Sequence, residues 1–225
     1  TLGAIAQSSY RMANDIRLLQ HDRQLEEPFG SSQIGSSAMA YKRNPMRCER
    51  ICSLSRYLMA DVSNAAMTAS VQWLERSLDD SANRRISMPE AFLCADAVLR
   101  LVINVVSGLT VNEKMIEKAL NEFMPFFATE NILMEGVKRG GDRQKLHEII
   151  RVCSMEASQK MKNGGDCDLP ERLADTGAFG MTAGEIRDVL NPELYIGRCP
   201  EQVSRLVEKI RLEIGDNKAH NIDIS

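Results

Sequence analysis

The sequence lacks the features of several large classes of protein. It has no apolar run near the about 18 residues that a membrane span needs, and no charged-then-apolar leader. Aromatic residues make up only 5% of the chain, which disfavours a β-sandwich. We therefore expect a cytoplasmic protein with no membrane partner.

Metal-binding and disulfide patterns are also missing. The six cysteines form no Cys-x-x-Cys pair, and only three histidines, His21, His147 and His220, are available to join them. We expect reduced thiols, no metal and no catalytic histidine in this chain. The formal net charge of −3 gives no general attraction to nucleic acid, so any anion-binding site has to be local.

Helical periodicity is present in almost every segment. With 44% hydrophobic residues and 12 methionines, the chain is typical of an all-α fold in which helices pack on helices. We predict that residues 1–110 form part of a long-helix bundle and that 111–225 form a smaller helical domain. Thr182 and Glu185 form a capping box in the second domain. Its predicted helices lie at about 112–124, 129–139, 143–162, 183–190 and 200–214.

The bundle should contain two long helices with local start signals. Asn44 is a good N-cap, and Pro45 suits the first position of the first helix. After a break at residues 79–81, Ser87 and Glu90 form a capping box that predicts the start of the second. The expected apolar stripes are Ile51, Leu54, Leu58, Val62, Ala65 and Ala69 in the first helix, and Phe92, Ala95, Leu99, Val102 and Val106 in the second.

Four cations gather at the start of the first long helix. Lys42, Arg43, Arg47 and Arg50 are close together in an acidic protein, with a single acidic residue, Glu49, among them. Cations at this end oppose the helix dipole, so their position is explained if an anion completes the site. The alternative is a solvated basic turn that pairs with nearby carboxylates.

A second basic cluster lies at the predicted break between the long helices. It holds Arg76, Arg84 and Arg85 together with the hydroxyl groups of Ser77 and Ser81. Guanidinium groups bind carboxylate or phosphate through paired hydrogen bonds, and hydroxyl groups add neutral ones. Two such clusters indicate a substrate with several anionic groups.

One loop of the chain resembles a family signature. Residues 35–45 read Gly-Ser-Ser-Ala-Met-Ala-Tyr-Lys-Arg-Asn-Pro, similar to the Gly-Ser-Ser-x-Met-Pro-x-Lys-x-Asn-Pro loop of the fumarase/aspartase superfamily. Within that superfamily, the Tyr-Lys-Arg-Asn-Pro variant, Glu27-Pro28-Phe29 and residues 78–85 resemble the adenylosuccinate lyase family. Ala40 departs from the pattern, where the family has proline. The resemblance implies a fumarase/aspartase-type helical bundle with a catalytic loop at 30–45, and the Gly/Ser content of that loop predicts mobility without ligand.

The resemblance also implies a reaction. Members of the family are carbon–nitrogen lyases that eliminate fumarate from adenylosuccinate, giving AMP, and from SAICAR, giving AICAR. Ser36 would be the base that removes a proton, and Lys42 the cation that stabilises its alkoxide. No cofactor is implied, because the carboxylate of the substrate delocalises the developing carbanion. The implied substrate-binding residues are Asn44, Arg50, Arg76, Ser81 and Arg85.

The family further implies a homotetramer whose active sites are shared between subunits. Its general-acid histidine belongs to an amino-terminal portion that this sequence does not contain, so we expect the chain to be an inactive fragment on its own. Two alternatives stay open. One is another enzyme of the superfamily, such as an argininosuccinate lyase, although residues 78–85 argue against it. The other is a non-catalytic helical assembly module.

Overall fold

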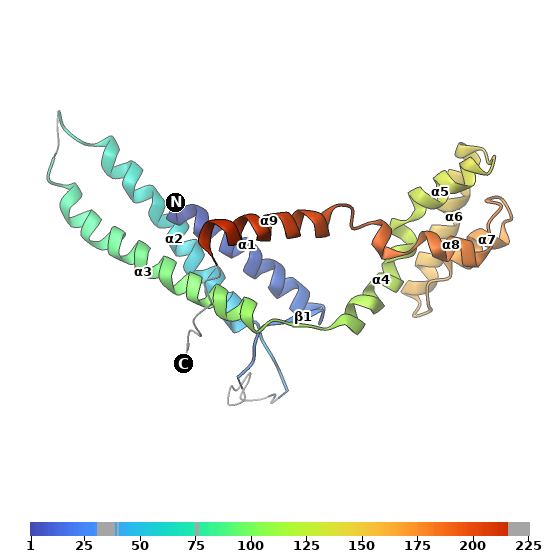
Figure 1. Ribbon diagram of the computed structural model, residues 1–225, viewed down its shortest axis with the longest axis horizontal. Helices are drawn as coiled ribbons and strands as arrows, with labels where there is room; N and C mark the ends of the chain where they lie inside the picture. The colour runs from blue at the N-terminus through green and yellow to red at the C-terminus, as the bar shows by residue number, and fades with distance from the viewer. Residues whose placement is uncertain (31–38, 40, 75–76, 216–225) are drawn as a thin grey trace. The chain divides into compact units, whose positions relative to one another are not determined.

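The structure, a computed structural model, describes residues 1–30, 39, 41–74 and 77–215. In that part of the chain the fold is all-α apart from one short pair of strands, which confirms the predicted fold class (Figure 1). The chain divides into two compact units, which begin at Thr1 and at Ile116. No helix of the described residues is long and apolar enough to cross a membrane.

Three long helices form the first unit. Helix α1 (Leu2–His21) runs antiparallel to α2 (Met46–Ser70), and α3 (Asp80–Ser107) returns along both (Figure 1). Apolar residues recur at helical spacing on the facing sides, and many are alanine or cysteine, which lets the helices approach closely. One buried cluster contains Ala13, Ile16, Cys48, Ile51, Cys52, Val98, Leu101 and Val105, and the other contains Ala6, Leu58, Ala91, Cys94 and Ala95.

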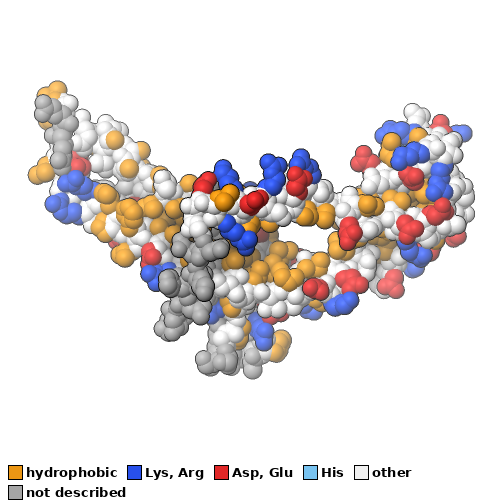
Figure 2. All heavy atoms as spheres, in the orientation of Figure 1, with side chains coloured by type: hydrophobic (Ala, Val, Ile, Leu, Met, Phe, Trp, Pro, Cys, Tyr) orange, Lys and Arg blue, Asp and Glu red, His pale blue; other side chains and the backbone are white. Residues whose placement is uncertain are grey.

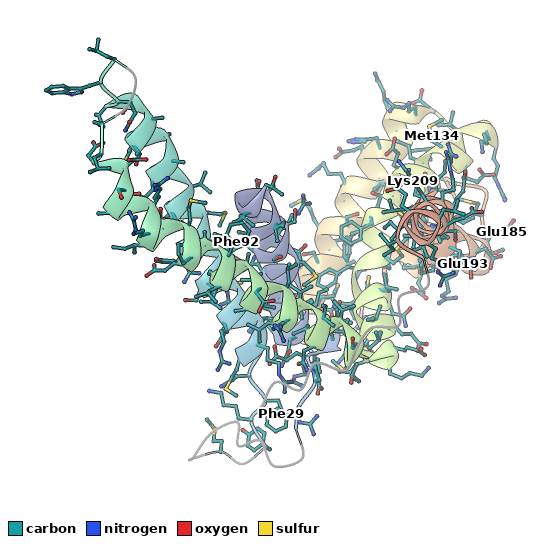
Figure 3. All side chains as sticks on the ribbon, turned by 60° about the vertical axis from the view of Figure 1, so that its left-hand side comes forward. Phe29, Phe92, Met134, Glu185, Glu193 and Lys209 are labelled. Atoms are coloured by element: carbon teal, nitrogen blue, oxygen red, sulfur yellow. The ribbon has the colours of Figure 1, made fainter. Side chains whose placement is uncertain are left out.

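Beyond these clusters, α2 and α3 continue as a two-helix hairpin. Neither residues 59–70 of α2 nor residues 80–90 of α3 include a buried side chain. Val62, in this stretch of α2, is 53% exposed, and the predicted stripe residues Phe92 and Val106 further along α3 are also exposed, at 61% and 55%. Figure 2 shows hydrophobic side chains gathered along this hairpin, and Figure 3 marks Phe92 on α3. The stripe is thus buried at Ile51, Leu58 and Ala95 and exposed or half-buried at its other large residues, as expected for helices that leave apolar surface to be covered by another chain.

Helix α3 starts earlier than the sequence predicted. It begins at Asp80 and continues through Pro89, so Ser87 and Glu90 form no capping box. The Ser87 hydroxyl bonds within its own helix, and Glu90 accepts a hydrogen bond from the Tyr57 hydroxyl on α2. That bond raises the pKa of Tyr57 to about 12. Pro89 removes one backbone hydrogen-bond donor from α3. The helix continues through it because contacts with α2, such as that between Tyr57 and Glu90, hold the neighbouring turns in place.

A short antiparallel pair closes the base of the first unit. Strand β1 (Leu25–Glu26) pairs with β2 (Thr110–Val111), with Leu25 opposite Val111. The Asn112 side chain donates to the Arg23 carbonyl oxygen at 2.9 Å and to Glu26 Oε1 at 3.2 Å. These bonds hold the segment that follows α1 against the segment that follows α3.

The second unit has a core of its own. Its helices are α4 (Glu113–Phe127), which starts in the first unit, α5 (Thr129–Lys138), α6 (Arg143–Lys162), α7 (Leu169–Asp175), α8 (Ala183–Val189), the 3₁₀ turn η1 (Pro192–Leu194) and α9 (Cys199–Ile214). The buried core consists of Ile132, Leu133, Leu146, Ile150, Cys153, Ala157, Leu169, Leu173, Phe179, Met181 and Ile186. Helix α7 was not predicted, because seven residues are too few to show a period and its start, unlike that of α8, has no capping box.

Local signals set the boundaries of these shorter helices. The predicted capping box of Thr182 and Glu185 is present at the start of α8. Gly140 and Gly164 follow the ends of α5 and α6 with φ of 96° and 86°, a conformation that favours glycine. Within α5, a Cβ on Gly136 would lie 2.8 Å from the Phe179 ring, so glycine is what lets this ring enter the core.

Candidate functional site

A buried carboxylate organises the start of α2. Glu27 is 3% exposed, and its two oxygens accept hydrogen bonds from the backbone N–H groups of Arg47 and Cys48, both at 2.9 Å. The first N–H groups of a helix have no partner within the helix, and the helix dipole favours negative charge there. Glu27 therefore caps α2. The backbone N–H of Glu27 in turn donates to Gln20 Oε1 at 3.0 Å, which ties the cap to α1.

The cap predicted at Asn44 is wrong. Helix α2 begins at Met46, after Pro45, and no side-chain cap comes from this segment. Asn44 contributes its carbonyl oxygen to the N–H of Met46 at 2.8 Å. Because proline disfavours a helical conformation in the residue before it, and because Glu27 already satisfies the first turn, the Asn44 side chain is not used as a cap.

Two of the four clustered cations bond within the chain. Arg43 forms an ion pair with Glu26, with 3.0 Å between Nη1 and Oε2, and lies 5.3 Å from the ring centroid of Phe29, which Figure 3 marks. The Arg47 guanidinium donates to the carbonyl oxygen of Pro28. For these two residues the alternative of a basic turn paired with nearby groups holds.

The other two cations are available for an anion. Lys42 and Arg50 are both exposed, and within the described residues neither side chain takes part in a hydrogen bond or an ion pair. The backbone N–H of Lys42 donates to the Met39 carbonyl oxygen at 3.0 Å. Ser36, Arg76 and most of the loop predicted to be mobile lie outside the described residues.

The cysteine nearest to this end of α2 has no sign of reactivity. Burial raises the pKa of the Cys48 thiol well above its ordinary value, and the adjacent Glu27 carboxylate raises it further. A thiol with a raised pKa stays protonated and is a poor nucleophile. All six cysteines of the chain are free, and the described residues contain no group of metal-ligating side chains that could hold an ion.

The second cluster is ordered by pairs one helical turn apart. Arg85 Nη1 donates to the Ser81 carbonyl oxygen at 2.9 Å and also to the Ser81 hydroxyl. Arg84 and Asp80 form a 4.0 Å ion pair on the same turns. Arg85 and Ser81 therefore act as one unit on α3, and the Arg85 side chain remains exposed to solvent.

A neighbouring acid is held in its charged form. Asp79 Oδ1 accepts hydrogen bonds from Ser77 Oγ at 2.5 Å and from Gln72 Nε2 at 3.2 Å. The bond from Ser77 holds the pKa of Asp79 below its usual value. Asp79 thus links Gln72 and Ser77 to the start of α3, and a carboxylate of lowered pKa is unsuited to act as a general acid.

The described residues of the two clusters lie at opposite ends of the α2–α3 hairpin. Asn83 Nδ2 donates to Asn64 Oδ1 at 3.1 Å, which places the first turns of α3 beside the distal part of α2. Lys42 and Arg50 are at the other end of α2, whose 25 residues span about 37 Å. The structure thus brings Lys42, Asn44 and Arg50 to one end and Ser81 and Arg85 to the other. One small molecule cannot contact both groups within one copy of this chain.

An apolar groove of about 830 Å³ borders the second cluster. Its apolar lining includes Leu58, Val62 and Phe92, near the first residues of α1, where the hairpin extends past that helix. Its polar lining comes from both helices of the hairpin and includes Asp61, Asn64 and Thr68 of α2 and Asp80, Asn83, Arg84 and Ser87 of α3. The groove is the place where the first unit leaves apolar side chains uncovered next to charged ones.

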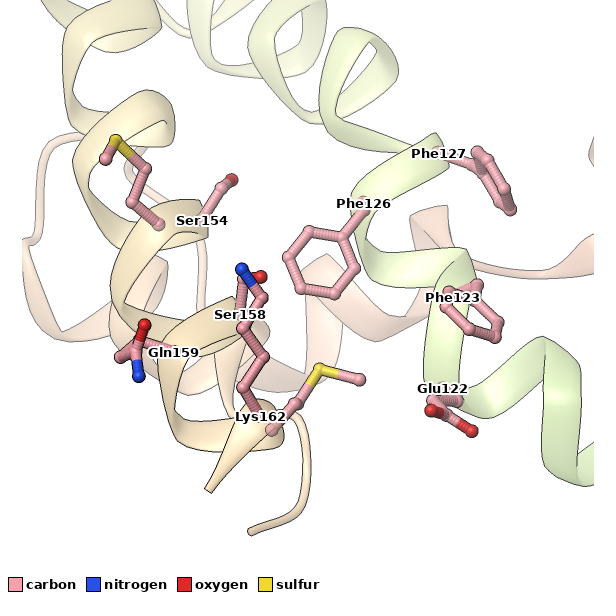
Figure 4. A pocket seen from close by; sticks show the side chains of 10 residues that line it. Glu122, Phe123, Phe126, Phe127, Ser154, Ser158, Gln159 and Lys162 are labelled. Atoms are coloured by element: carbon pink, nitrogen blue, oxygen red, sulfur yellow. The ribbon is translucent and has the colours of Figure 1, made fainter. Parts of the chain in front are cut away.

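The second unit has a groove of about 650 Å³ between α4 and α6. Figure 4 shows Phe126 on α4 pointing towards α6, which contributes Ser154, Ser158, Gln159 and Lys162 to the lining, and Phe123 and Phe127 of α4 complete the apolar side. The Ser154 hydroxyl is buried without a hydrogen-bond partner in the described residues. None of the predicted site residues lies here, although the lining also includes Glu122.

Sequence reasoning missed the role of Glu27. It treated Glu27-Pro28-Phe29 only as part of a family resemblance, although two adjacent acids, Glu26 and Glu27, precede a loop that ends in four cations. Acidic residues before the loop and basic residues at its end could have predicted that the two ends of the loop pair with each other. They did not show which acid pairs with a side chain and which caps a helix.

Known proteins resemble this chain over most of its length. Residues 125–206 match the family model described as adenylosuccinate lyase C-terminus, and residues 1–59 match the model described as lyase. The adenylosuccinate lyases of Schizosaccharomyces pombe and Saccharomyces cerevisiae are 50% and 51% identical to it over 209 residues, or 92% of this chain. The chain spans 43% of the length of each of these relatives. The resemblance read from the loop and from residues 78–85 is confirmed.

Solved structures share the fold. The 3-carboxy-cis,cis-muconate lactonizing enzyme from Pseudomonas putida superposes with a TM-score of 0.79 at 23% identity, over 94% of this chain and 46% of that one. A class II fumarase from Schistosoma mansoni gives 0.63 at 17% identity, over 85% and 37%. At these identities the likeness concerns the fold alone, and it confirms the predicted fumarase/aspartase type.

Proposed function

We propose that this chain is the carboxy-terminal portion of an adenylosuccinate lyase, which eliminates fumarate from adenylosuccinate to give AMP and from SAICAR to give AICAR. The observation that carries the proposal is the 50% identity, over 92% of the chain, to a relative of that name. We place the enzyme in the cytoplasm, which agrees with its six free cysteines. The reaction needs no metal and no organic cofactor.

In the proposed reaction, Ser36 removes a proton from the succinyl carbon next to the carbon that carries nitrogen. A serine hydroxyl is a weak base, so its alkoxide needs a nearby cation, and the exposed, unpaired Lys42 supplies it. The adjacent carboxylate of the substrate delocalises the electron pair left by the proton. That pair then forms the fumarate double bond as the carbon–nitrogen bond breaks, and a histidine of the amino-terminal portion protonates the leaving nitrogen.

The two basic clusters bind the anionic parts of the substrate. Asn44 and Arg50 hold the dicarboxylate near Lys42, while the other cluster binds phosphate or ribose through Arg76, Ser81 and Arg85. Because the clusters are separated by the length of α2 within one chain, each active site combines them from different copies. The exposed apolar stripes of α2 and α3 supply the contact surface for a homotetramer. Residues 1–110 then belong to a central bundle domain, and residues 111–225 form the carboxy-terminal domain.

The deciding experiment replaces the proposed base. In the full-length enzyme, Ser36→Ala should lower fumarate release by at least about 10³-fold, because it removes both proton transfer and its activation. Oligomeric state and thermal stability should stay near those of the parent, since a loop substitution of this kind changes stability by about 0.5 kcal/mol or less. Ser37→Ala is the matched control and should be much milder. Equal losses in the two variants would refute the role of Ser36, and a full-length protein without any fumarate release would favour the assembly module.

A second experiment tests the anion sites. Arg50→Leu, Arg76→Leu or Arg85→Leu in the full-length enzyme should each raise the free energy of the transition state by roughly 2–5 kcal/mol, the range for a buried charged contact. Steady-state kinetics with adenylosuccinate measures this. Arg100→Leu is a control, because among the described residues Arg100 pairs only with Asp96, one turn away on α3. Parent-like kinetics in all three variants would mean that these arginines form a solvated face.

A further inference from the structure

The two ends of the loop that carries Ser36 and Lys42 are joined by a compact set of bonds. On one side lie Glu26, Glu27 and Pro28, and on the other lie Arg43 and the first turn of α2. The Glu27 carboxylate accepts from two α2 amides, the Arg47 guanidinium returns a bond to the Pro28 carbonyl, and Arg43 pairs with Glu26. Side chain and backbone thus bond reciprocally across the base of the loop.

Only a carboxylate of the right length satisfies this arrangement. Two parallel N–H donors, those of Arg47 and Cys48, point at the Glu27 side chain, which offers one oxygen to each at 2.9 Å. A glutamine would turn its NH₂ group towards one of these donors, and at 3% exposure there is little access for water to relieve the mismatch. An aspartate keeps both oxygens but is shorter by one methylene.

We propose that Glu27 is a positioning residue for the elimination reaction. It fixes the start of α2 against the segment that ends at Pro28, and so fixes the point from which Lys42 and Arg50 reach the substrate. Lys42 precedes the first residue of α2 by four positions, and Arg50 follows it by about one turn, so a displaced helix start moves both cations. The role rests on the proposed function. It differs from that of the proposed base, because Glu27 is buried and acts through the helix rather than on the substrate.

The test compares Glu27→Gln with Ile51→Val in the full-length enzyme. Ile51 is fully buried on the same helix but makes no bond to the loop ends, so its variant controls for a general loss of stability. Hydrogen exchange at the amides of Arg47 and Cys48 should be at least about 10-fold faster in Glu27→Gln and unchanged in Ile51→Val. The kcat for fumarate release should fall about 10²-fold, the effect of a misplacement near 1 Å, with KM changed by less than about 3-fold. Glu27→Asp should recover part of kcat.

Each outcome separates the role of Glu27 from the reaction itself. A parent enzyme that releases no fumarate overturns the proposed function and this role with it. A working parent whose Glu27→Gln variant keeps its kcat, or keeps slow exchange at both amides, overturns the role of Glu27 alone. Equal losses of kcat in Glu27→Gln and Ile51→Val at equal melting temperature also overturn it, because they show a structural effect only. If Glu27→Gln does not fold, Glu27→Asp carries the same comparison.

Discussion

The second unit buries a complete core, whereas the first leaves much of its apolar surface in solvent. Phe179, in the second unit, is 1% exposed, while Phe92 and Leu93 on α3 are 61% and 70% exposed. The difference follows from helix length. Helices of 7 to 20 residues, such as α5 to α8, can close around one centre, whereas α2 and α3, with 25 and 28 residues, outrun the only helix of the described residues that lies along them. The parts of α2 and α3 beyond α1 therefore have no buried side chain of their own among the described residues.

The largest effect on folding is expected at the centre of the second unit. Phe179→Ala removes a ring that packs against α5 and α6, and should lower the free energy of unfolding of this unit by about 3–5 kcal/mol. Native-state hydrogen exchange at the buried amides of α6 measures it, with α1 as the internal reference. Phe127→Ala is the control, because Phe127 is 72% exposed and its loss should cost far less. Equal effects of the two variants would contradict a self-contained core.

A smaller effect, on association and not on folding, is expected in the first unit. Phe92→Ala should weaken self-association of the full-length enzyme by about 2 kcal/mol, or about 30-fold in the dissociation constant, as for a central aromatic contact. Analytical ultracentrifugation over a range of concentrations measures it. Met155→Ala, at an exposed position of the second unit, should leave association unchanged. A parent protein that stays monomeric at micromolar concentration would show that the exposed stripe has another purpose.

The smallest effect concerns pH and is confined to the second unit. The Thr182 backbone N–H, with help from Arg139, lowers the pKa of Glu185 to about 2. Because this value lies below the about 4.3 of an unfolded chain, the carboxylate stabilises the fold above that pH, and the contribution disappears as pH falls towards 2. Glu185→Gln should therefore show a flatter dependence of melting temperature on pH between 5 and 2, followed by circular dichroism. An unchanged slope would mean that other carboxylates dominate.

Helix caps formed by residues close together in the sequence were easier to predict than a cap formed by a distant residue. The capping box of Thr182 and Glu185 depends on residues three apart, and the structure contains it. The cap expected at Asn44 failed because a carboxylate 20 positions upstream of Arg47 reaches the same amides, and helical periodicity carries no information about such a contact. Ser87 and Glu90 had the spacing of a capping box, but the helix had already begun at Asp80.

The same limit applies to the candidate site. The residue types of both basic clusters could be found by composition, and their family by the loop motif. The partners of the four cations depend on the folded positions of Glu26 and Pro28. Arg43 and Arg47 bond to these two residues, whereas Lys42 and Arg50 stay exposed. The distance between the clusters likewise follows from an uninterrupted α2, and not from the two motifs themselves.

The unsupported end of the hairpin has a mechanical consequence. Ser81 and Arg85 precede Ala91, the first buried residue of α3, and Ser81 overhangs it by about 15 Å. If the hairpin rotates by about 4° about the level of Ala91, the Ser81 hydroxyl moves by about 1 Å. A displacement of this size is enough to weaken the positioning of a substrate. The position of Ser81 and Arg85 relative to a bound ligand therefore depends on the contacts that support the hairpin along its length. A substitution that weakens those contacts can displace these two side chains even if it lies far from the ligand.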